Sequence, residues 1–249
     1  MFQSATLKWC GILSIAATGW MTSSAKAAPL ALVDLQVVDA NPTDNHPTNP
    51  SLPDKSGAAA IGSATDTWNQ VGAVASGGFT TAQLATTTGV PTSVTISLTS
   101  GNGSFNNGSP NPDPLLEQYV GGAGSTTGSI NGLTPGASYD IYLYGTNGRG
   151  TVGSTFTVNG DPTSQTASGQ PSNSPPYVQG VDYVVFTGQV AAGGTIPFTV
   201  SDISGMPGDC CFILDGIQIQ GQSFPAPEPT CFALTGLAGI GLLVRRRRA

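Results

Sequence analysis

The chain has 249 residues with eight Lys or Arg, fourteen Asp or Glu and one histidine, for a formal net charge of −6. Six of the basic residues lie near the two ends, so a central body at about 28–222 keeps Lys55 and Arg149 against thirteen acids, a net charge of −11. This charge argues against nucleic acid as a partner because nothing in the body can neutralise phosphates. The body is long enough for one large domain with its own core.

Residues 1–27 have the organisation of a secretory signal peptide. Lys8 supplies the positive start, and Trp9–Met21 form a short apolar run. The small residues Ala25 and Ala27 match the pattern before a cleavage site. We therefore expect export, with cleavage after Ala27 or Ala28.

The body has the pattern of an all-β domain. Leu30–Val38 is an apolar run of β-forming residues, and Thr92–Leu98 alternates polar and apolar residues as a half-buried strand does. Clusters of Gly, Asn, Ser and Pro between such runs indicate turns. Asp113–Tyr119 is the one stretch expected to form a turn or two of helix. Further strands are expected at Ser138–Tyr144, Ser154–Val158, Val181–Thr187, Thr195–Ser201 and Phe212–Ile219.

A tight loop precedes the strand at 138–144. Leu133 can enter the core, Pro135 and Gly136 make a turn, and Tyr139 follows at once. Fibronectin type III domains carry a similar Leu-x-Pro-Gly-x-x-Tyr corner, and that fold is an alternative here. Such a domain needs only about 100 residues, however, and the body holds no second copy of the corner.

The order of several short motifs resembles galactose-binding-like jelly rolls. The resemblance implies a single jelly-roll-like β-sandwich over 28–222, with carbohydrate binding by analogy only, because a fold does not confer a function. The motifs are Trp68-Asn69, Leu115-Leu116 before Tyr119, Gly132 to Gly136 before Tyr139 to Gly145, Phe156 to Gly160, Tyr183 to Phe186 and Leu214 to Ile219.

Calcium is the cofactor that this resemblance suggests. Related carbohydrate-binding jelly rolls often hold a structural Ca²⁺ between their first and last strands. Asp215, together with Asp34 or Asp39 near the start of the body, resembles that placement. A hard cation needs several such oxygen ligands. The alternative is that Asp215 and Gly216 form a bulge or turn and that Asp34 is a solvated strand residue.

A sugar ligand would need aromatic rings to stack on and polar groups to meet its hydroxyls. Trp68, Tyr119 and Tyr177, with Arg149, are the candidate ligand residues because they lie in or beside expected loops. The alternative for each of them is a packing role.

The sequence carries no recognisable catalytic pattern. His46 is the only histidine and stands in a segment rich in Pro and Asn, at 41–50. The chain has no Gly-x-Ser-x-Gly elbow, no His-x-x-x-His pair and no phosphate loop. A glycosidase would need two carboxyls that meet in space, and Glu117 is the sole glutamate of the body. We therefore expect a protein that is not an enzyme.

The C-terminal segment 223–249 has three parts in a fixed order. Pro227, Glu228 and Pro229 keep the chain extended, because proline fixes φ and lacks an N–H donor. Cys231–Val244 follows, an apolar run of 14 residues. As a helix it would measure about 21 Å, short of a hydrocarbon core of about 30 Å. Four arginines, Arg245, Arg246, Arg247 and Arg248, then favour a cytoplasmic end for the helix.

This order resembles the PEP-CTERM sorting signal of exported proteins in Gram-negative bacteria that make extracellular polysaccharide. The resemblance implies that an exosortase recognises Pro227, Glu228 and Pro229 while the short helix tethers the chain to the inner membrane. Release to the cell surface or extracellular matrix would follow. An ordinary tail anchor is the alternative.

The function expected is a non-catalytic structural or interaction protein, processed by an exosortase and associated with exopolysaccharide. The first alternative is a dedicated carbohydrate-binding module, with or without a stabilising Ca²⁺. Ice binding is a minor alternative. It rests on the number of threonines at Thr80, Thr81 and 86–88, which lack the regular Thr-x-Thr spacing of a flat ice face.

Overall fold

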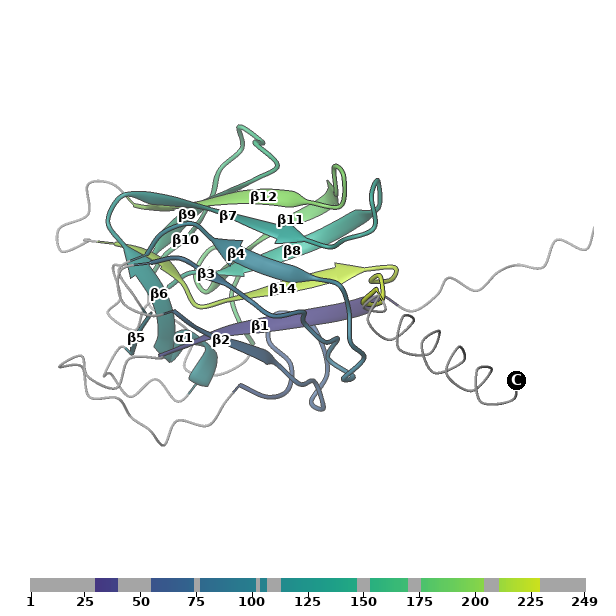
Figure 1. Cartoon of the computed structure of the whole chain (residues 1–249). Helices are drawn as coiled ribbons and strands as arrows, with labels where there is room; N and C mark the ends of the chain where they lie inside the picture. The colour runs from purple at the N-terminus through teal and green to yellow at the C-terminus, as the bar shows by residue number, and fades with distance from the viewer. Residues whose placement is uncertain are drawn as a thin grey trace, which may run out of the picture.

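The computed structural model describes residues 30–39, 55–73, 77–101, 104–106, 113–146, 153–169, 176–203 and 211–228. Strands dominate this part of the chain, and two large sheets face each other as a sandwich (Figure 1). The expected all-β, jelly-roll-like sandwich is confirmed. The expected signal peptide and the apolar run Cys231–Val244 lie outside the described residues.

The first sheet has five strands and joins the two ends of the body. All its neighbouring strands are antiparallel except β1 and β2, which are parallel. In spatial order the strands are β11 (Tyr183–Val190), β8 (Ser138–Tyr144), β14 (Gly216–Gly221), β1 (Ala31–Asp39) and β2 (Asn69–Ala73).

The second sheet has six strands, all antiparallel to their neighbours. Its order is β10 (Gln165–Ala167), β9 (Ser154–Val158), β12 (Ile196–Asp202), β7 (Ser125–Asn131), β4 (Thr95–Leu98) and β3 (Phe79–Thr80). A smaller three-stranded sheet lies at one end of the sandwich. It contains β13 (Phe212–Leu214), β6 (Gln118–Gly122) and β5 (Ser104–Asn106).

The main core fills the space between the two large sheets. Alternate residues of each strand enter it, because successive side chains of a strand point to opposite faces. On β1 these residues are Val33, Leu35 and Val37, all fully buried. From the six-stranded sheet come Ile96, Leu98, Phe156, Val158, Ile196, Phe198 and Val200.

Several expected elements differ from the structure in extent. The run Phe212–Ile219 is not one strand, because it divides at Asp215 into β13 and β14, which enter different sheets. The expected helix is shorter, with α1 at Pro114–Glu117, and the chain continues directly into β6. Asp113 caps α1 by accepting a hydrogen bond from Leu115 N at 2.9 Å.

β7 was not expected from the sequence, although it lies between β12 and β4 inside the six-stranded sheet. Its inward side chains are those of Thr126, Gly128 and Ile130, so only one of them is a large apolar residue. The pattern therefore lacks the apolar alternation by which a half-buried strand is recognised.

The folded body continues past residue 222, where we expected it to end. Phe224 packs against the main core and stacks on Tyr139, with ring centroids 5.7 Å apart. Ser93 donates hydrogen bonds to the Pro225 carbonyl from its N–H at 2.8 Å and its hydroxyl at 3.2 Å. Among the described residues no helix is long and apolar enough to cross a bilayer.

The close approach of β7 to β12 gives a test of the sandwich. A Cβ added to Gly128 would lie 2.2 Å from Phe198 Cζ, whereas one added to Gly77 would meet nothing within 4 Å. We expect Gly128→Ala to lower the free energy of unfolding by about 1–3 kcal/mol through overpacking. Gly77→Ala, the matched control, should change it by about 0.5 kcal/mol or less. Urea unfolding of the purified body measures both, and equal midpoints would contradict this packing.

Candidate functional site

Two of the four residues proposed to bind a sugar, Trp68 and Tyr177, have packing roles in the fold. The Trp68 indole N–H donates to the Gly57 carbonyl at 2.9 Å, and its ring meets Tyr144 edge-on at 6.5 Å. Tyr177 is only 7% exposed, and its hydroxyl donates to the Asp113 carboxylate. Both rings therefore pack within a layer of loops and helix that covers the outer face of the five-stranded sheet. They do not form a platform on which a sugar could stack.

Of the other two candidates, Tyr119 is half-buried on β6. Arg149 lies outside the described residues. The structure therefore assembles no sugar site from Trp68 and Tyr177.

That covering layer lies on the outer face of the five-stranded sheet, where β1, β8 and β14 direct polar side chains. Gln218 is central, because its amide oxygen accepts from the Tyr144 hydroxyl and its nitrogen donates to Asp34 Oδ1 at 3.1 Å. The Tyr144 oxygen also accepts from Ala60 N at 2.8 Å. We call Asp34, Gln36, Tyr144 and Gln218 the outer-face network.

A buried ion pair fastens the loop and helix that cover this network. Lys55 Nζ lies 3.4 Å from Asp113 Oδ2, with the two side chains 6% and 3% exposed, and 5.2 Å from the centre of the Tyr177 ring. Gln36 accepts from Lys55 N at 2.9 Å and donates to the Pro114 carbonyl at 2.8 Å. Lys55 is the only lysine or arginine in the described part of the chain.

The residues proposed for calcium do not converge. Asp34 on β1 lies opposite Gln218 on β14. The Asp215 carbonyl accepts a hydrogen bond from Val37 N instead, and Val37 stands three residues after Asp34 on β1. Three strand residues span about 10 Å. Asp215 Oδ2 accepts from Thr146 N at 2.8 Å, away from Asp34.

Asp39 ends β1, and its side chain lies outside the described set. No group of three or more acidic, histidine or cysteine side chains in the described residues could hold a metal ion. Because Ca²⁺ takes six to eight oxygen ligands, Asp34 and Asp215 do not fit a shared calcium site.

Burial gives Asp34 an unusual titration. Desolvation raises its pKa from 3.8 to about 8, although the hydrogen bond from Gln218 acts in the opposite direction. Asp215 is fully buried, and desolvation raises its pKa as well. Asp34 is therefore expected to be protonated in the folded protein at neutral pH, and the shift of the Asp215 pKa has the same direction. A buried neutral acid avoids the large cost of a buried charge.

These raised pKa values predict that the protein loses stability as the pH rises. Between pH 3.8 and about 8 the folded state keeps the Asp34 proton that the unfolded state has lost. The stabilisation is thus complete below pH 3.8 and is lost progressively up to about pH 8. We expect Asp34→Asn to reduce the difference in unfolding free energy between pH 5 and pH 8, measured by urea unfolding.

Asp202→Asn, at a half-buried position that ends β12, is the matched control and should keep the wild-type difference. An equal pH dependence in Asp34→Asn and wild type would show that Asp34 titrates normally in the folded protein.

The threonines considered for ice binding do not share a face. Thr81, Thr86 and Thr87 are buried, and only Thr80 and Thr88 are exposed. Serine and threonine instead cover the outer face of the six-stranded sheet. Adjacent strands of a sheet are rotated by about 20–25°, so this face is twisted and not flat. Its hydroxyl pairs include Ser97 with Ser129 at 2.8 Å and Thr99 with Thr127 at 3.1 Å.

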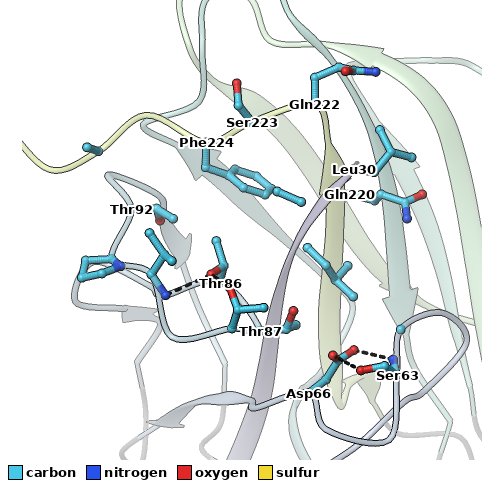
Figure 2. A pocket seen from close by; sticks show the side chains of 17 residues that line it. Leu30, Ser63, Asp66, Thr86, Thr87, Thr92, Gln220, Gln222, Ser223 and Phe224 are labelled. Atoms are coloured by element: carbon cyan, nitrogen blue, oxygen red, sulfur yellow. Dashed lines mark hydrogen bonds between the residues drawn. The ribbon is translucent and has the colours of Figure 1, made fainter. Parts of the chain in front are cut away.

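A groove of about 590 Å³ lies where the two ends of the body meet (Figure 2). Gln222 and Ser223 lie at one end of it, and Ser63 and Asp66 at the other. Its sides are built by the start of β1 at 30–32, the loop at 86–92 and the segment 220–226 that ends β14 and leaves it. None of the three described residues proposed to bind a sugar, Trp68, Tyr119 and Tyr177, lines this groove.

The groove combines exposed apolar surface with neutral polar groups. Leu30 and Val90 are 51% and 58% exposed, and Phe224 adds a half-buried ring. Within the described part of the chain, the side-chain amides of Gln220 and Gln222 make no hydrogen bond. Such groups are free to meet a ligand.

The one ionisable side chain among the described lining residues, Asp66, is already hydrogen-bonded. Asp66 accepts from Ser63 N and from the Ser63 hydroxyl, both at 2.7 Å, and so holds the turn that closes one end of the groove.

The segment that leaves β14 is held against the body and forms one wall of the groove. The Ser223 carbonyl accepts from the Tyr139 hydroxyl at 3.4 Å, and Ser93 holds the Pro225 carbonyl. We call Ser223, Phe224 and Pro225 the clamped segment. An aromatic residue just after the last strand was the available sequence signal for this wall, and the expected boundary at 222 had separated it from the body.

No protein-family model matches the chain, and no curated protein is significantly similar to it. Among solved structures, an exo-β-1,3-galactanase from Phanerochaete chrysosporium with galactose is 27% identical over 41% of this chain and 23% of its own, with a TM-score of 0.28. TmCBM61 in complex with β-1,4-galactotriose is 16% identical over 49% of this chain and 86% of its own, with a TM-score of 0.32.

A complex of the plant peptide RALF23 with FER and LLG2 is 13% identical over 78% of this chain and 40% of that one, with a TM-score of 0.35. The chain thus spans less than a quarter of the galactanase chain. All three TM-scores are low, so the description of the fold rests on the strands and sheets of this chain itself.

Proposed function

We propose that this chain is an exported, non-catalytic glycan-binding protein and that the groove beside Phe224 is its binding site. The observation that carries the proposal is the composition of the groove, in which exposed apolar and aromatic surface is bordered by neutral hydroxyls and amides. A sugar presents the complementary surface, with C–H groups that pack on apolar side chains and hydroxyls that exchange hydrogen bonds.

The groove is supported from beneath, which favours binding. Phe224 is stacked on Tyr139 at an interplanar angle of 27°, and Tyr139 is 1% exposed and belongs to the main core. The ring is thus fixed before a ligand arrives, and less conformational entropy is lost on binding. A volume of about 590 Å³ lies within the range of about 300–1,000 Å³ typical of small-molecule sites. It suits a short stretch of a polysaccharide.

A non-catalytic role agrees with the same lining. Glycoside hydrolysis by the common mechanisms requires two carboxyl groups on either side of the scissile bond. The described residues that line the groove include one acid, Asp66, and no histidine, cysteine or glutamate. The proposed role of the site is therefore retention of a glycan and not its cleavage.

Substitution of Phe224 tests the site. We expect Phe224→Leu, which keeps an apolar side chain over Tyr139, to weaken binding about 2- to 10-fold by removing the aromatic face. Gln222→Ala should also weaken it. Val178→Ala, at a position 48% exposed and outside the groove, is the control. The measurement is affinity electrophoresis in gels that contain neutral polysaccharides or the host's own exopolysaccharide.

Binding by Phe224→Leu equal to that of wild type, with the control also unchanged, would place the glycan elsewhere. No retardation of wild type by any polysaccharide would contradict the proposed function.

A second role is proposed for the residues after the clamped segment, as a sorting signal read by an exosortase. Residues 223–228 have no regular secondary structure, and the clamp ends at Pro225. Pro227 and Glu228 follow after one residue, Ala226, and Glu228 is exposed. A processing enzyme would thus meet the start of the motif at the surface of the folded body. Pro229 and the arginines at 245–248 lie outside the described residues.

On this proposal, the chain is first tethered to the inner membrane and is then delivered to the cell surface or extracellular matrix of a Gram-negative bacterium. There the body would contact extracellular polysaccharide through the groove. The glycan-binding role requires only that the body be exported, so it stands independently of the enzyme that removes the tail.

Replacing the terminal arginines tests the sorting role. With serine at 245–248 we expect the unprocessed chain to accumulate, because the positive charge that holds the end of the helix in the cytoplasm is gone. The matched control has lysine at the same four positions and should be processed as wild type. Cell fractionation and immunoblotting measure both, and normal processing of the serine variant would contradict the sorting role.

A further inference from the structure

We infer that the ligand of the groove is a neutral polysaccharide and that polysaccharides carrying carboxylates or sulfates are excluded. This inference rests on the proposed glycan-binding function and adds the chemical class of the glycan. It depends on which charges surround the groove and which are missing from it.

The described lining of the groove holds no side chain that recognises anionic sugars. Carboxylates and sulfates are bound in proteins mainly by arginine and lysine, which form charge-assisted hydrogen bonds. None of the described residues that line the groove is basic. Lys55 is the only Lys or Arg in the described part of the chain, and it is 7% exposed and paired with Asp113 under the covering layer. It is therefore not available to a ligand in the groove.

The charge that is present repels an anion. The Asp66 carboxylate closes one end of the groove and receives its hydrogen bonds from Ser63, which is neutral. The body as a whole has a formal net charge of −11, and a protonated Asp34 removes only one unit of it. At low ionic strength these charges act over more than about 10 Å, so an acidic chain is disfavoured before it reaches the groove.

The available polar groups suit hydroxyls. The amides of Gln220 and Gln222 and the hydroxyls of Thr88 and Ser223 can each donate and accept hydrogen bonds. A sugar hydroxyl also does both, so a neutral ring can be satisfied without any ion pair. An ionised carboxylate only accepts, and it would lose hydration without gaining a positive partner.

Paired polysaccharides that differ only in charge test the inference. Soluble β-1,4-galactan, glucomannan and pullulan are each compared with the same polymer after oxidation of its C6 hydroxyls to carboxylates, by affinity electrophoresis of the full body. At low ionic strength we expect a neutral polymer to bind and its oxidised form to bind about tenfold more weakly. The difference should narrow in about 0.5 M salt, because screening weakens the repulsion.

A charge added to the groove provides a gain of function. Thr88→Lys places a cation at an exposed lining position and should raise the affinity for the oxidised polymer relative to the affinity for its neutral parent. Val190→Lys is the matched control, because Val190 is 51% exposed and does not line the groove. This control should give a smaller rise, due only to the reduced net charge.

The outcomes separate the inference from the function on which it rests. If an oxidised polymer binds as well as its neutral parent at low salt, the ligand class is wrong and the glycan-binding function stands. Equal gains in affinity for the oxidised polymer from Thr88→Lys and Val190→Lys would also overturn the inference, because the charge of the polymer would then not act at the groove. If no polymer of either charge binds, the proposed function itself fails.

Discussion

The antiparallel pairing of β1 with β14 is the contact on which the rest of the molecule depends. It joins the first and last strands of the body, with Ala31 opposite Gly221 and Gln36 opposite Gly216. This long-range pairing completes the five-stranded sheet and so closes the main core against the six-stranded sheet. It also places residue 30 beside residues 220–226, which creates the groove. One strand pairing thus brings the two ends of the body together and forms the candidate binding site between them.

The same pairing contains buried polar and acidic groups. Asp34 and Gln218 lie opposite each other in its register, both fully buried, under a layer fastened by the Lys55 and Asp113 ion pair. Among the described residues, the buried oxygens without a hydrogen-bond partner are Asp34 Oδ2, Asp215 Oδ1 and Glu117 Oε2. Protonation removes the charge from a carboxyl, which explains how Asp34 can be buried here without an ion pair of its own.

The charge distribution connects the fold with the proposed role. The many acids of the body oppose its self-association, because a large net charge makes copies of the chain repel one another. The groove and the outer face of the six-stranded sheet are instead lined by hydroxyls and amides. A protein with this arrangement can remain dispersed while it contacts a neutral glycan. The clamped segment connects the groove with the proposed sorting signal, because one wall of the groove is the stretch of chain that leads to Pro227 and Glu228.

The sequence by itself determined the features that depend on local chemistry. The strands at Ser138–Tyr144 and Ser154–Val158 have the expected bounds because their apolar alternation has the period of a half-buried strand. The cap at Asp113 and its neighbouring Pro114 likewise produce a short helix within the stretch expected to be helical. The order of proline, apolar run and arginines at the C-terminus is also a property of the chain alone.

Only the tertiary structure determined which residues form the candidate site. The groove collects residues from 30–32, 62–66, 86–92 and 220–226, and no local pattern relates threonines and glutamines so far apart. Trp68 and Tyr177 resemble ligand residues in sequence, yet the loops that carry them turn their polar atoms toward Gly57 and Asp113. Asp34 and Asp215 are separated because β1 and β14 pair in one register. Side-chain type is fixed by the sequence, but which side chains meet is fixed by long-range strand pairing.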